Sequence, residues 1–291
     1  MKSAPFDYHA PESLAEAVSL LSEVGEDAKV LAGGQSLLPL LAMRLTRFDH
    51  LIDVTAVGEL QGIERVNGHV RVGAAVRQSI AEHDATVAAD VPLLADALPY
   101  IGHFQIRNRG TVGGSTAHAD PCSELPAVAL ALDAELEIAG SSGARVVSAA
   151  DFFQGTWTTT IAPDEILVAI RYPVWAGAGY GVRELARRRG DFAIAGAACA
   201  VSLASDGRVE RAAIAMFGMG PTPLRGRAAE AALVGEDPAN VDVDAIGDAA
   251  VTDTEPTDDI HAPAWYRKRV GARLVKRALN DALGEVTHAR A

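Results

Sequence analysis

The stretch AKVLAGGQSLLPLLAMRL (residues 28–45) places two adjacent glycines between two apolar runs. The first run predicts a short strand over residues 29–32. The second run predicts a helix over residues 37–45, with Pro39 in its first turn, where proline is tolerated. Ser36 stands directly before this helix, at the position expected of an N-cap residue. The glycines therefore either form a tight turn or allow the backbone to come close to a ligand.

The sequence on either side of this stretch predicts a small parallel sheet. Residues 12–22 carry apolar side chains at helical spacing, and residues 50–54 (HLIDV) predict a second strand. A strand, a helix and a strand thus follow one another over a short length. This order is typical of parallel α/β units.

The middle of the chain predicts antiparallel strands instead. Asn67-Gly68 is a strong hairpin signal, because a type I′ turn needs positive φ at both central positions. The sequence Ser141-Ser142-Gly143 separates a second pair of strands in the same way. The expected strands are residues 63–66, 69–76, 135–138, 144–147 and 165–171, with helices over residues 91–100 and 124–134.

The last third of the chain predicts a separate α+β domain. We interpret the glycine-rich stretch VWAGAGYG (residues 174–181) as a linker. Three antiparallel strands and a layer of helices are expected after it, with strands over residues 183–189, 195–204 and 208–217 and helices over residues 226–234, 243–250 and 263–283. The predicted division is a first domain of residues 1–176, with lobes of residues 1–57 and 58–176, and a second domain of residues 177–291.

Composition narrows the possible functions. The chain has 291 residues, of which 49% are hydrophobic, and its formal net charge of -12 disfavours nucleic acid as a partner. We find no signal peptide and no transmembrane segment, so the expected location is the cytoplasm. Cys122 and Cys199 are the only cysteines, too few for a four-cysteine iron–sulfur cluster or an all-cysteine zinc site. Redox chemistry would need a bound organic cofactor or a centre in another chain.

A second glycine pair occurs in TVGGSTAHADPCSELPAVAL (residues 111–130), which also leads into an apolar helix through serine, leucine and proline. Glycine-rich turns before helices can direct backbone N–H groups at a phosphate without a Cβ in the way. Neither loop has the sequence of a P-loop or of a G-x-G-x-x-G turn. The spacing leaves two interpretations, namely a pyrophosphate held between two loops or two ordinary tight turns.

Other candidate sites are weaker. His118 and Asp120 resemble a catalytic pair, although such a pair on a loop is more often a local hydrogen bond. No H-x-x-x-H, H-E-x-x-H or G-x-S-x-G motif is present, so neither a metal site nor a nucleophilic serine is expected. We interpret the basic residues 266–279 as the solvated face of a helix or a subunit contact. Three aromatic residues are expected in the core, Trp157, Trp265 and, with a second role considered below, Phe192.

Two longer motifs together resemble a known family. KVLAGGQSLLPLLAMRL and HFQIRNRGTVGGSTAHADPCSELPAVALALDAELEI are closely similar to the FAD-binding medium subunit of the molybdenum hydroxylases. That family includes aerobic carbon monoxide dehydrogenase and relatives of xanthine dehydrogenase. DEILVAIRYP, RRRGDFAIAGAA and WYRKRVGARLVKRAL follow in the family's order, so the resemblance covers essentially the whole chain. It implies a FAD-binding domain of the p-cresol methylhydroxylase type and then a C-terminal flavoprotein domain.

The resemblance also implies which residues contact FAD. The first loop would wrap the pyrophosphate with Ala32, Gly33, Gly34, Gln35 and Ser36. The second loop would close on it from the other side with Thr111, Gly113, Gly114 and Ser115.

Further contacts are implied along the rest of the cofactor. His118 and Asp120 would lie near the ribityl chain. The family usually has aspartate where this chain has Glu124, so a direct contact from this longer side chain is left open. The remaining positions are Leu167, which would pack near the flavin or the adenine, and Arg183 and Phe192, which would approach the isoalloxazine from the C-terminal domain.

The family's division of labour implies partner subunits. A large subunit holds the molybdopterin cofactor and the substrate, and a small subunit holds two [2Fe-2S] clusters. The medium subunit passes electrons from the clusters through FAD to an acceptor such as a quinone, a cytochrome, NAD or oxygen. The expected assembly is a dimer of heterotrimers, and no side chain of this chain is expected to perform acid–base catalysis on the organic substrate.

Two alternatives stay open at this point. The chain could be a self-sufficient FAD-dependent oxidase or dehydrogenase of the same fold superfamily, with its own substrate pocket. It could also be a non-enzymatic binding module whose glycine loops are turns only.

Overall fold

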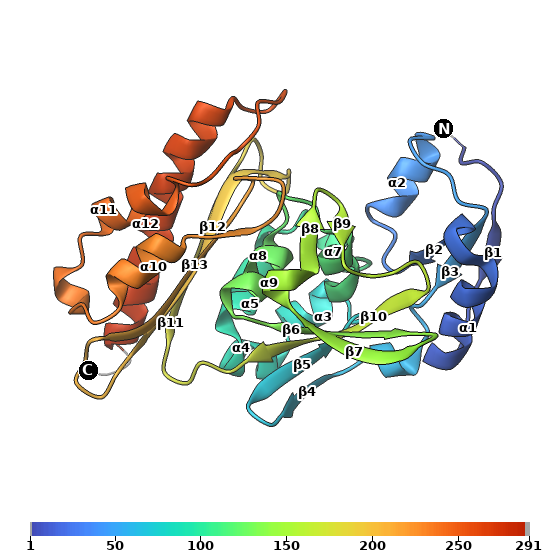
Figure 1. The fold of residues 1–291 in the computed structure, drawn as a ribbon, viewed down its shortest axis with the longest axis horizontal. Coiled ribbons are helices and arrows are strands. Elements are labelled where there is room, and N and C mark those ends of the chain that lie inside the picture. Colours follow the sequence, from blue (N-terminus) through green and yellow to red (C-terminus); the bar gives the residue numbers. More distant parts are fainter. Residues whose placement is uncertain (1, 289–291) are drawn as a thin grey trace.

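The computed structural model describes residues 2–288, and three parts of the chain follow one another along its long axis (Figure 1). The N-terminal lobe (residues 2–57) lies at one end, and the middle lobe (residues 58–173) lies in the centre. The C-terminal region (residues 179–288) forms the other end. Within the described residues, no helix is both long and apolar enough to cross a bilayer.

The N-terminal lobe contains a three-stranded parallel sheet in the order β1-β3-β2, which confirms the predicted parallel unit and adds one strand to it. Its elements are β1 (Asp7–His9), α1 (Leu14–Val24), β2 (Ala28–Leu31), α2 (Leu37–Ala42) and β3 (His50–Asp53). Helix α2 ends three residues earlier than predicted, and the chain then turns through Arg44 at φ 57°. Ser36 holds the N-cap position, but its side chain makes no capping hydrogen bond.

The middle lobe is built on a five-stranded sheet in the order β4-β5-β10-β6-β7, and its neighbouring strands pair antiparallel. Asn67 and Gly68 both have positive φ, which confirms the predicted hairpin turn. Its strands are β4 (Ile63–Val66), β5 (His69–Gly73), β6 (Glu135–Gly140), β7 (Gly143–Ser148) and β10 (Glu165–Pro173). A separate two-stranded sheet consists of β8 (Phe153–Gly155) and β9 (Thr158–Thr159).

Short helices cover this sheet. They are α3 (Gln78–Glu82), α4 (Ala85–Asp90), α5 (Pro92–Ala97), α6 (Phe104–Arg107), α7 (Val112–His118), α8 (Glu124–Ala131) and α9 (Ala149–Phe152). The predicted helix over residues 91–100 is α5 followed by a 3-10 turn. Every residue of α8 is buried, as expected of a helix that is apolar on all sides.

The C-terminal region has four antiparallel strands rather than the predicted three, in the order β11-β12-β13-β14. The extra strand has only two residues and follows a loop of glycine and proline, so it leaves no alternating pattern in the sequence. The elements are β11 (Gly179–Ala186), β12 (Ala193–Leu203), β13 (Val209–Phe217), β14 (Leu224–Arg225), α10 (Arg227–Leu233), α11 (Val243–Ala250) and α12 (Ala264–His288).

Strand β11 begins inside the stretch that we interpreted as a linker, and the glycines there have a packing role. A Cβ on Gly179 would lie 2.1 Å from the carbonyl oxygen of Ala282, and one on Gly181 would lie 2.2 Å from that of Ala278. Both carbonyls belong to α12, so the glycines allow the helix backbone to lie directly on the strand. Gly179 and Gly181, which we interpreted as part of a loop, are therefore strand residues that lie beneath α12.

The C-terminal sheet packs on both faces. The helices α10 to α12 cover one face, and the other face lies against the middle lobe (Figure 1). Tyr180 and Val182 of β11 and Phe217 of β13 belong to the same hydrophobic cluster as Leu94 and Leu125 of the middle lobe. One core thus continues across the junction between these two parts of the chain.

Three aromatic residues that we expected in the core lie at the surface. Trp157 is 64% exposed, Phe192 is 65% exposed and Trp265 is 64% exposed. Each stands in or next to a loop. Because loops lack a regular hydrophobic repeat, the burial of these side chains could not be predicted from the sequence.

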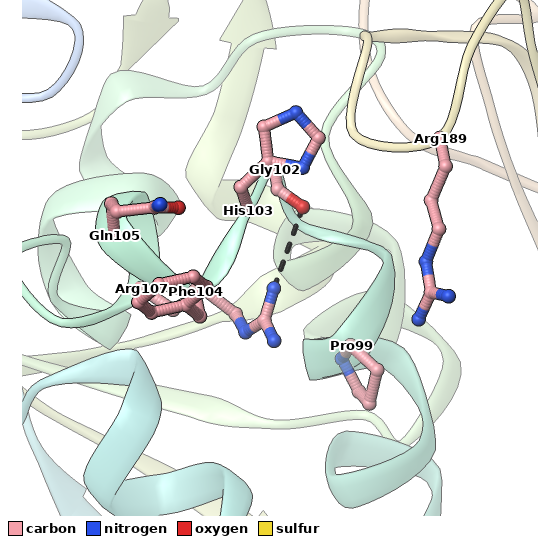
Figure 2. A pocket seen from close by; sticks show the side chains of 7 residues that line it. All are labelled: Pro99, Gly102, His103, Phe104, Gln105, Arg107 and Arg189. Atoms are coloured by element: carbon pink, nitrogen blue, oxygen red, sulfur yellow. Dashed lines mark hydrogen bonds between the residues drawn. The ribbon is translucent and has the colours of Figure 1, made fainter.

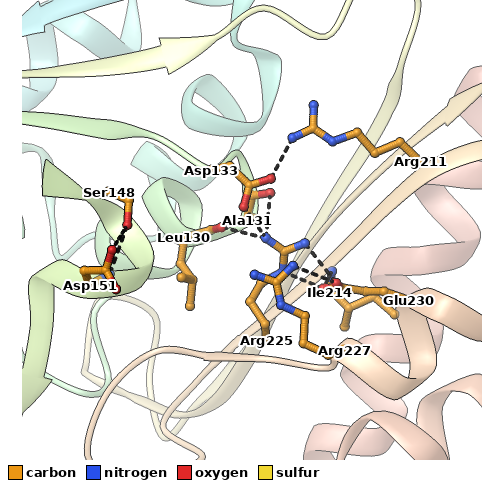
Figure 3. A network of polar contacts seen from close by, with 10 residues as sticks. All are labelled: Leu130, Ala131, Asp133, Ser148, Asp151, Arg211, Ile214, Arg225, Arg227 and Glu230. Carbon is orange, nitrogen blue, oxygen red and sulfur yellow. Dashed lines mark hydrogen bonds and ion pairs between the residues drawn. The ribbon is translucent and has the colours of Figure 1, made fainter.

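A network of polar contacts fastens the C-terminal region to the end of α8 (Figure 3). Arg225 donates to the carbonyl oxygen of Leu130 at 2.9 Å and to the Asp133 carboxylate at 2.9 Å. The same guanidinium pairs with Glu230 at 2.9 Å, and Arg211 reaches Asp133 at 2.6 Å. Arg225 thereby satisfies a carbonyl that the end of a helix leaves without an internal partner.

We predict that Arg225→Ala lowers the free energy of unfolding by about 3 to 5 kcal/mol, because it leaves the Glu230 charge buried without its partner. Glu230 is 8% exposed and Arg225 is 6% exposed at their side chains. Urea unfolding followed by circular dichroism measures the change. Arg227 is the matched control, since it meets the same carboxylate at 3.5 Å but is 62% exposed. Its change to alanine should cost less than about 1 kcal/mol, and equal losses in both variants would contradict the prediction.

Candidate functional site

The first loop (residues 32–36) connects β2 to α2 and presents unpaired backbone donors. Gly34 has φ +72°, a left-handed conformation that side chains rarely adopt. Gln35 closes the turn by donating from Nε2 to the carbonyl oxygen of Gly33 at 2.9 Å. Within the described part of the chain, the backbone N–H groups of Gly34, Gln35 and Ser36 have no protein acceptor. These donors sit before a helix, where an anionic group would satisfy them.

The second loop (residues 111–115) forms the start of α7, and here the protein uses its own donors. Thr111 caps the helix by accepting from the N–H of Gly114 at 2.9 Å. The N–H of Gly113 donates to Ala74 at 2.9 Å, and that of Ser115 donates to Thr111 at 3.1 Å. The idea that backbone amides of both loops converge on a phosphate therefore fits the first loop better than the second.

The structure brings the two loops into contact. A Cβ on Gly33 would lie 2.3 Å from the carbonyl oxygen of Arg109 and 2.6 Å from the Cα of Gly110. A Cβ on Gly114 would lie 3.2 Å from the Cβ of Ala32. Two segments almost eighty residues apart in sequence thus form one site between the N-terminal and middle lobes. Glycine is required at residue 33 by this backbone contact, whether or not a ligand is bound.

Beyond α7 the chain is held by Trp157, which the sequence analysis did not select as a site residue. Asp120 accepts from the Trp157 ring nitrogen at 3.1 Å and from the N–H of Cys122 at 2.9 Å. The His118 ring is stacked on the indole, with centroids 6.4 Å apart. Burial lowers the pKa of His118, opposed by the charge of Asp120, and so favours the neutral imidazole. His118 and Asp120 thus share a partner and make no hydrogen bond to each other among the described contacts.

Trp157 also has an unusual backbone. Its φ is +55°, which is an outlier for a bulky residue and costs about 1 to 3 kcal/mol. Such conformations concentrate at functional sites, where the surrounding contacts hold them in place. The hairpin between β8 and β9 therefore places one exposed indole beside the residues that follow the second loop.

Glu124 opens α8 and is only 7% exposed. Its carboxyl group lies within hydrogen-bonding reach of the carboxyl group of Glu184 on β11. Burial raises the pKa of Glu124 to about 7 and that of Glu184 to about 8. We call these two residues the acid pair. Glu184 was missed because β11 begins inside the stretch that we interpreted as a linker, which hid the buried face that Glu184 shares with Tyr180.

The other predicted positions are more widely distributed. Leu167 lies in β10 at a register shift and is 5% exposed within the core of the middle lobe. Arg183 on β11 forms an ion pair with Asp281 of α12 at 2.7 Å. Phe192 is an exposed residue directly before β12. Leu167 shares a hydrophobic cluster with Val112 of the second loop, whereas no hydrogen bond or ion pair of the described residues joins the side chains of Arg183 or Phe192 to either loop.

A pocket of about 440 Å³ lies around the start of α6, in the segment that precedes the second loop along the chain (Figure 2). Its floor is fixed by Arg107, which forms a bidentate ion pair with Glu82 at 2.6 and 3.0 Å. Arg189 reaches toward it from the turn between β11 and β12 (Figure 2). The lining residues are Pro99, Gly102, His103, Phe104, Gln105, Arg107 and Arg189.

These features define a class of protein. The first loop offers anion-binding donors at a junction of lobes, and the pocket and Trp157 add aromatic surface farther along. Among the described residues, no group of three or more histidine, cysteine or acidic side chains could hold a metal ion. The unpaired N–H groups of the first loop suit an organic cofactor with a phosphate group, of the kind that dinucleotides carry.

Comparisons with known proteins identify the family. Residues 4–175 match the FAD binding domain in molybdopterin dehydrogenase, and residues 180–282 match the CO dehydrogenase flavoprotein C-terminal domain. The carbon monoxide dehydrogenase medium chain of Hydrogenophaga pseudoflava is 40% identical over 279 residues, covering 95% of this chain and 96% of that one. The 6-hydroxypseudooxynicotine dehydrogenase complex subunit alpha of Paenarthrobacter nicotinovorans is 38% identical over 97% of this chain and 96% of its own length.

Solved structures agree. The structure of carbon monoxide dehydrogenase from Hydrogenophaga pseudoflava matches with a TM-score of 0.94 and 41% identity, over 98% of this chain and 99% of that chain. The chain therefore belongs to the family of FAD-binding medium chains of carbon monoxide dehydrogenase and related molybdenum hydroxylases. The α+β fold expected from the resemblance is confirmed.

We predict that Gly33→Ala destabilises the protein by about 1 to 3 kcal/mol and abolishes FAD retention, because the added Cβ separates the two loops. Differential scanning calorimetry and the flavin absorbance of the purified protein measure the two effects. Gly58→Ala is the control, since a Cβ there meets no atom within 4 Å. Full flavin occupancy with unchanged stability in Gly33→Ala would show that the loops do not need this contact.

Proposed function

We propose that this chain is the FAD-binding electron-transfer subunit of a molybdenum hydroxylase complex. The observation that supports it best is the contact between the two glycine loops, which leaves the N–H groups of Gly34, Gln35 and Ser36 free for a pyrophosphate. The whole-chain similarity to medium chains of oxidoreductases supports it as well. The chain is thus an oxidoreductase subunit with FAD as its cofactor.

We further propose how the chain holds FAD. The first loop binds the pyrophosphate with Ala32, Gly33, Gly34, Gln35 and Ser36, and the second loop closes the site with Thr111, Gly113, Gly114 and Ser115. Farther along the cofactor lie His118, Asp120, Glu124, Leu167, Arg183 and Phe192. When bound, FAD supplies the redox chemistry, since it accepts two electrons and can release them one at a time. The chain's own residues bind it, orient it and limit access to it.

Partner subunits follow from the same proposal. We infer that a small subunit with [2Fe-2S] clusters and a large subunit with the molybdopterin cofactor complete the complex, as a dimer of heterotrimers. The chain contains too few cysteines for a cluster, and both are unpaired thiols. Phe104 at the pocket is 63% exposed, which suits contact with a partner or with an acceptor such as a quinone, a cytochrome, NAD or oxygen.

Domain boundaries and location also stay proposals. We propose a FAD-binding domain of residues 1–176, with lobes of residues 1–57 and 58–176, and a C-terminal domain of residues 177–291. The continuous core across their junction suggests that the two fold as one cooperative unit. A cytoplasmic location remains an expectation from the sequence.

We predict that Trp157→Ala weakens FAD binding about tenfold, because His118 and Asp120 lose the side chain that orders both of them. Titration of the FAD-free protein with FAD, followed by flavin fluorescence, gives the dissociation constants. Trp265→Ala is the matched control, since that indole is also 64% exposed but lies at the start of α12. Equal affinities in wild type and Trp157→Ala would show that Trp157 does not contribute to FAD binding.

The proposed function is tested by purification from the native host. The chain should carry FAD and bring down two further subunits that contain molybdenum and iron. The separated chain should accept electrons from a chemical reductant and oxidise no small organic molecule by itself. Oxidation of an organic substrate by the separated chain would favour the self-sufficient oxidase, and a colourless protein that cannot take up FAD would favour a binding module.

A further inference from the structure

The acid pair lies at the junction between the middle lobe and the C-terminal region, where Glu124 is buried and Glu184 is half-buried. Glu124 is the first residue of α8, which is buried along its whole length. Glu184 follows Tyr180 and Val182 on the face of β11 that packs against the middle lobe, since alternate residues of a strand share a face. Each acid therefore comes from a different part of the chain, and they meet where the two parts pack together.

The chemistry of this contact requires a proton. An ionised carboxylate can only accept hydrogen bonds, so two carboxylates cannot bond to each other. The Oε2 atom of Glu184 is buried, and no N–H or O–H group of the described residues donates to it. A proton on one of the two carboxyl groups would satisfy this atom and remove the repulsion between like charges.

The charged groups around the acid pair do not replace that proton. Asp120, in the segment before α8, is also an acid and raises the pKa of its neighbour further. On the opposite side of β11, Arg183 is engaged by Asp281 of α12. Asp96 of α5 and Glu285 of α12 add negative charge near that arginine. Among the described residues, no cation contributes to the pKa of either member of the acid pair.

We propose that Glu124 and Glu184 together hold one proton, and that this shared proton keeps the junction beside the FAD site closed. Loss of the proton places two negative charges in an apolar contact. The carboxylates then separate, which loosens the start of α8 and, four residues before it, Asp120, the partner of Trp157. Protonation of the acid pair is thereby linked to FAD retention, an extension that rests on the proposed function.

The direction of the pH dependence follows from linkage. Burial raises the pKa of both acids above the ordinary glutamate value of 4.5, so the folded state binds a proton that the unfolded chain releases. The stability that the pair contributes is complete below the ordinary glutamate pKa of 4.5. It is lost as the pH rises through neutrality to about 8.

The test compares wild type with Glu184→Gln, which keeps the shape and can donate from its amide to the Glu124 carboxylate without a bound proton. Infrared spectra of the full-length protein should contain a protonated carboxylic acid band that disappears above about pH 8 and is missing in Glu184→Gln. The Tm of wild type should fall more steeply with pH than that of the variant. Glu210→Gln, at an exposed position of β13, is the control and should behave as wild type does.

A parallel titration with FAD connects the proton to the cofactor. The Kd of wild type for FAD should begin to rise near neutrality and approach a tenfold increase per pH unit above about pH 8, as expected for one linked proton, and that of Glu184→Gln should stay level. If wild type bound FAD but showed the same spectra and the same pH dependence as Glu184→Gln, the proposal of a shared proton would be wrong, and the proposed function would be unaffected. If FAD bound at no pH, the proposed function would fail, while the infrared and Tm measurements would still decide the proton site.

Discussion

The close approach of Gly33 to the backbone of Arg109 and Gly110 is the contact on which the candidate site depends. It joins the parallel sheet of the N-terminal lobe to the loop that opens α7 in the middle lobe. The carbonyl of Arg109 is held in place from the other side by the guanidinium of Arg77. Because no side chain fits between these segments, backbone packing sets the position of the first loop and its free N–H groups, and the Gln35 side chain closes the turn.

The C-terminal sheet imposes a second constraint, since it is covered on both faces. Its strands are rich in alanine and glycine, which let α12 lie close on one side and the middle lobe on the other. Arg225 and the acid pair stand at opposite ends of α8 and fasten that helix to the sheet. The two contacts differ in character. Arg225 joins carboxylates and a carbonyl through charged hydrogen bonds, whereas the contact between the two acids depends, in our proposal, on a proton.

The arrangement suits a subunit that carries electrons and leaves substrate choice to another chain. Relatives of similar identity belong to complexes named for carbon monoxide and for 6-hydroxypseudooxynicotine, which have little chemistry in common. At the junction of the N-terminal and middle lobes, polar groups of the two loops and of the segment that follows α7 come together. These groups are suited to holding an elongated cofactor in a fixed orientation.

The sequence by itself determined the order of the elements, the turn at Asn67 and Gly68 and both glycine loops, because hydrophobic period and turn chemistry are local properties. It also indicated the family, since the motifs around the two loops are specific together. The tertiary structure decided which packing contact each of these glycines makes possible. Gly33 serves a contact between distant loops, and Gly179 and Gly181 serve a helix a hundred residues away. The acid pair and the role of Trp157 likewise depend on which distant segments meet, and no local pattern in the sequence records that.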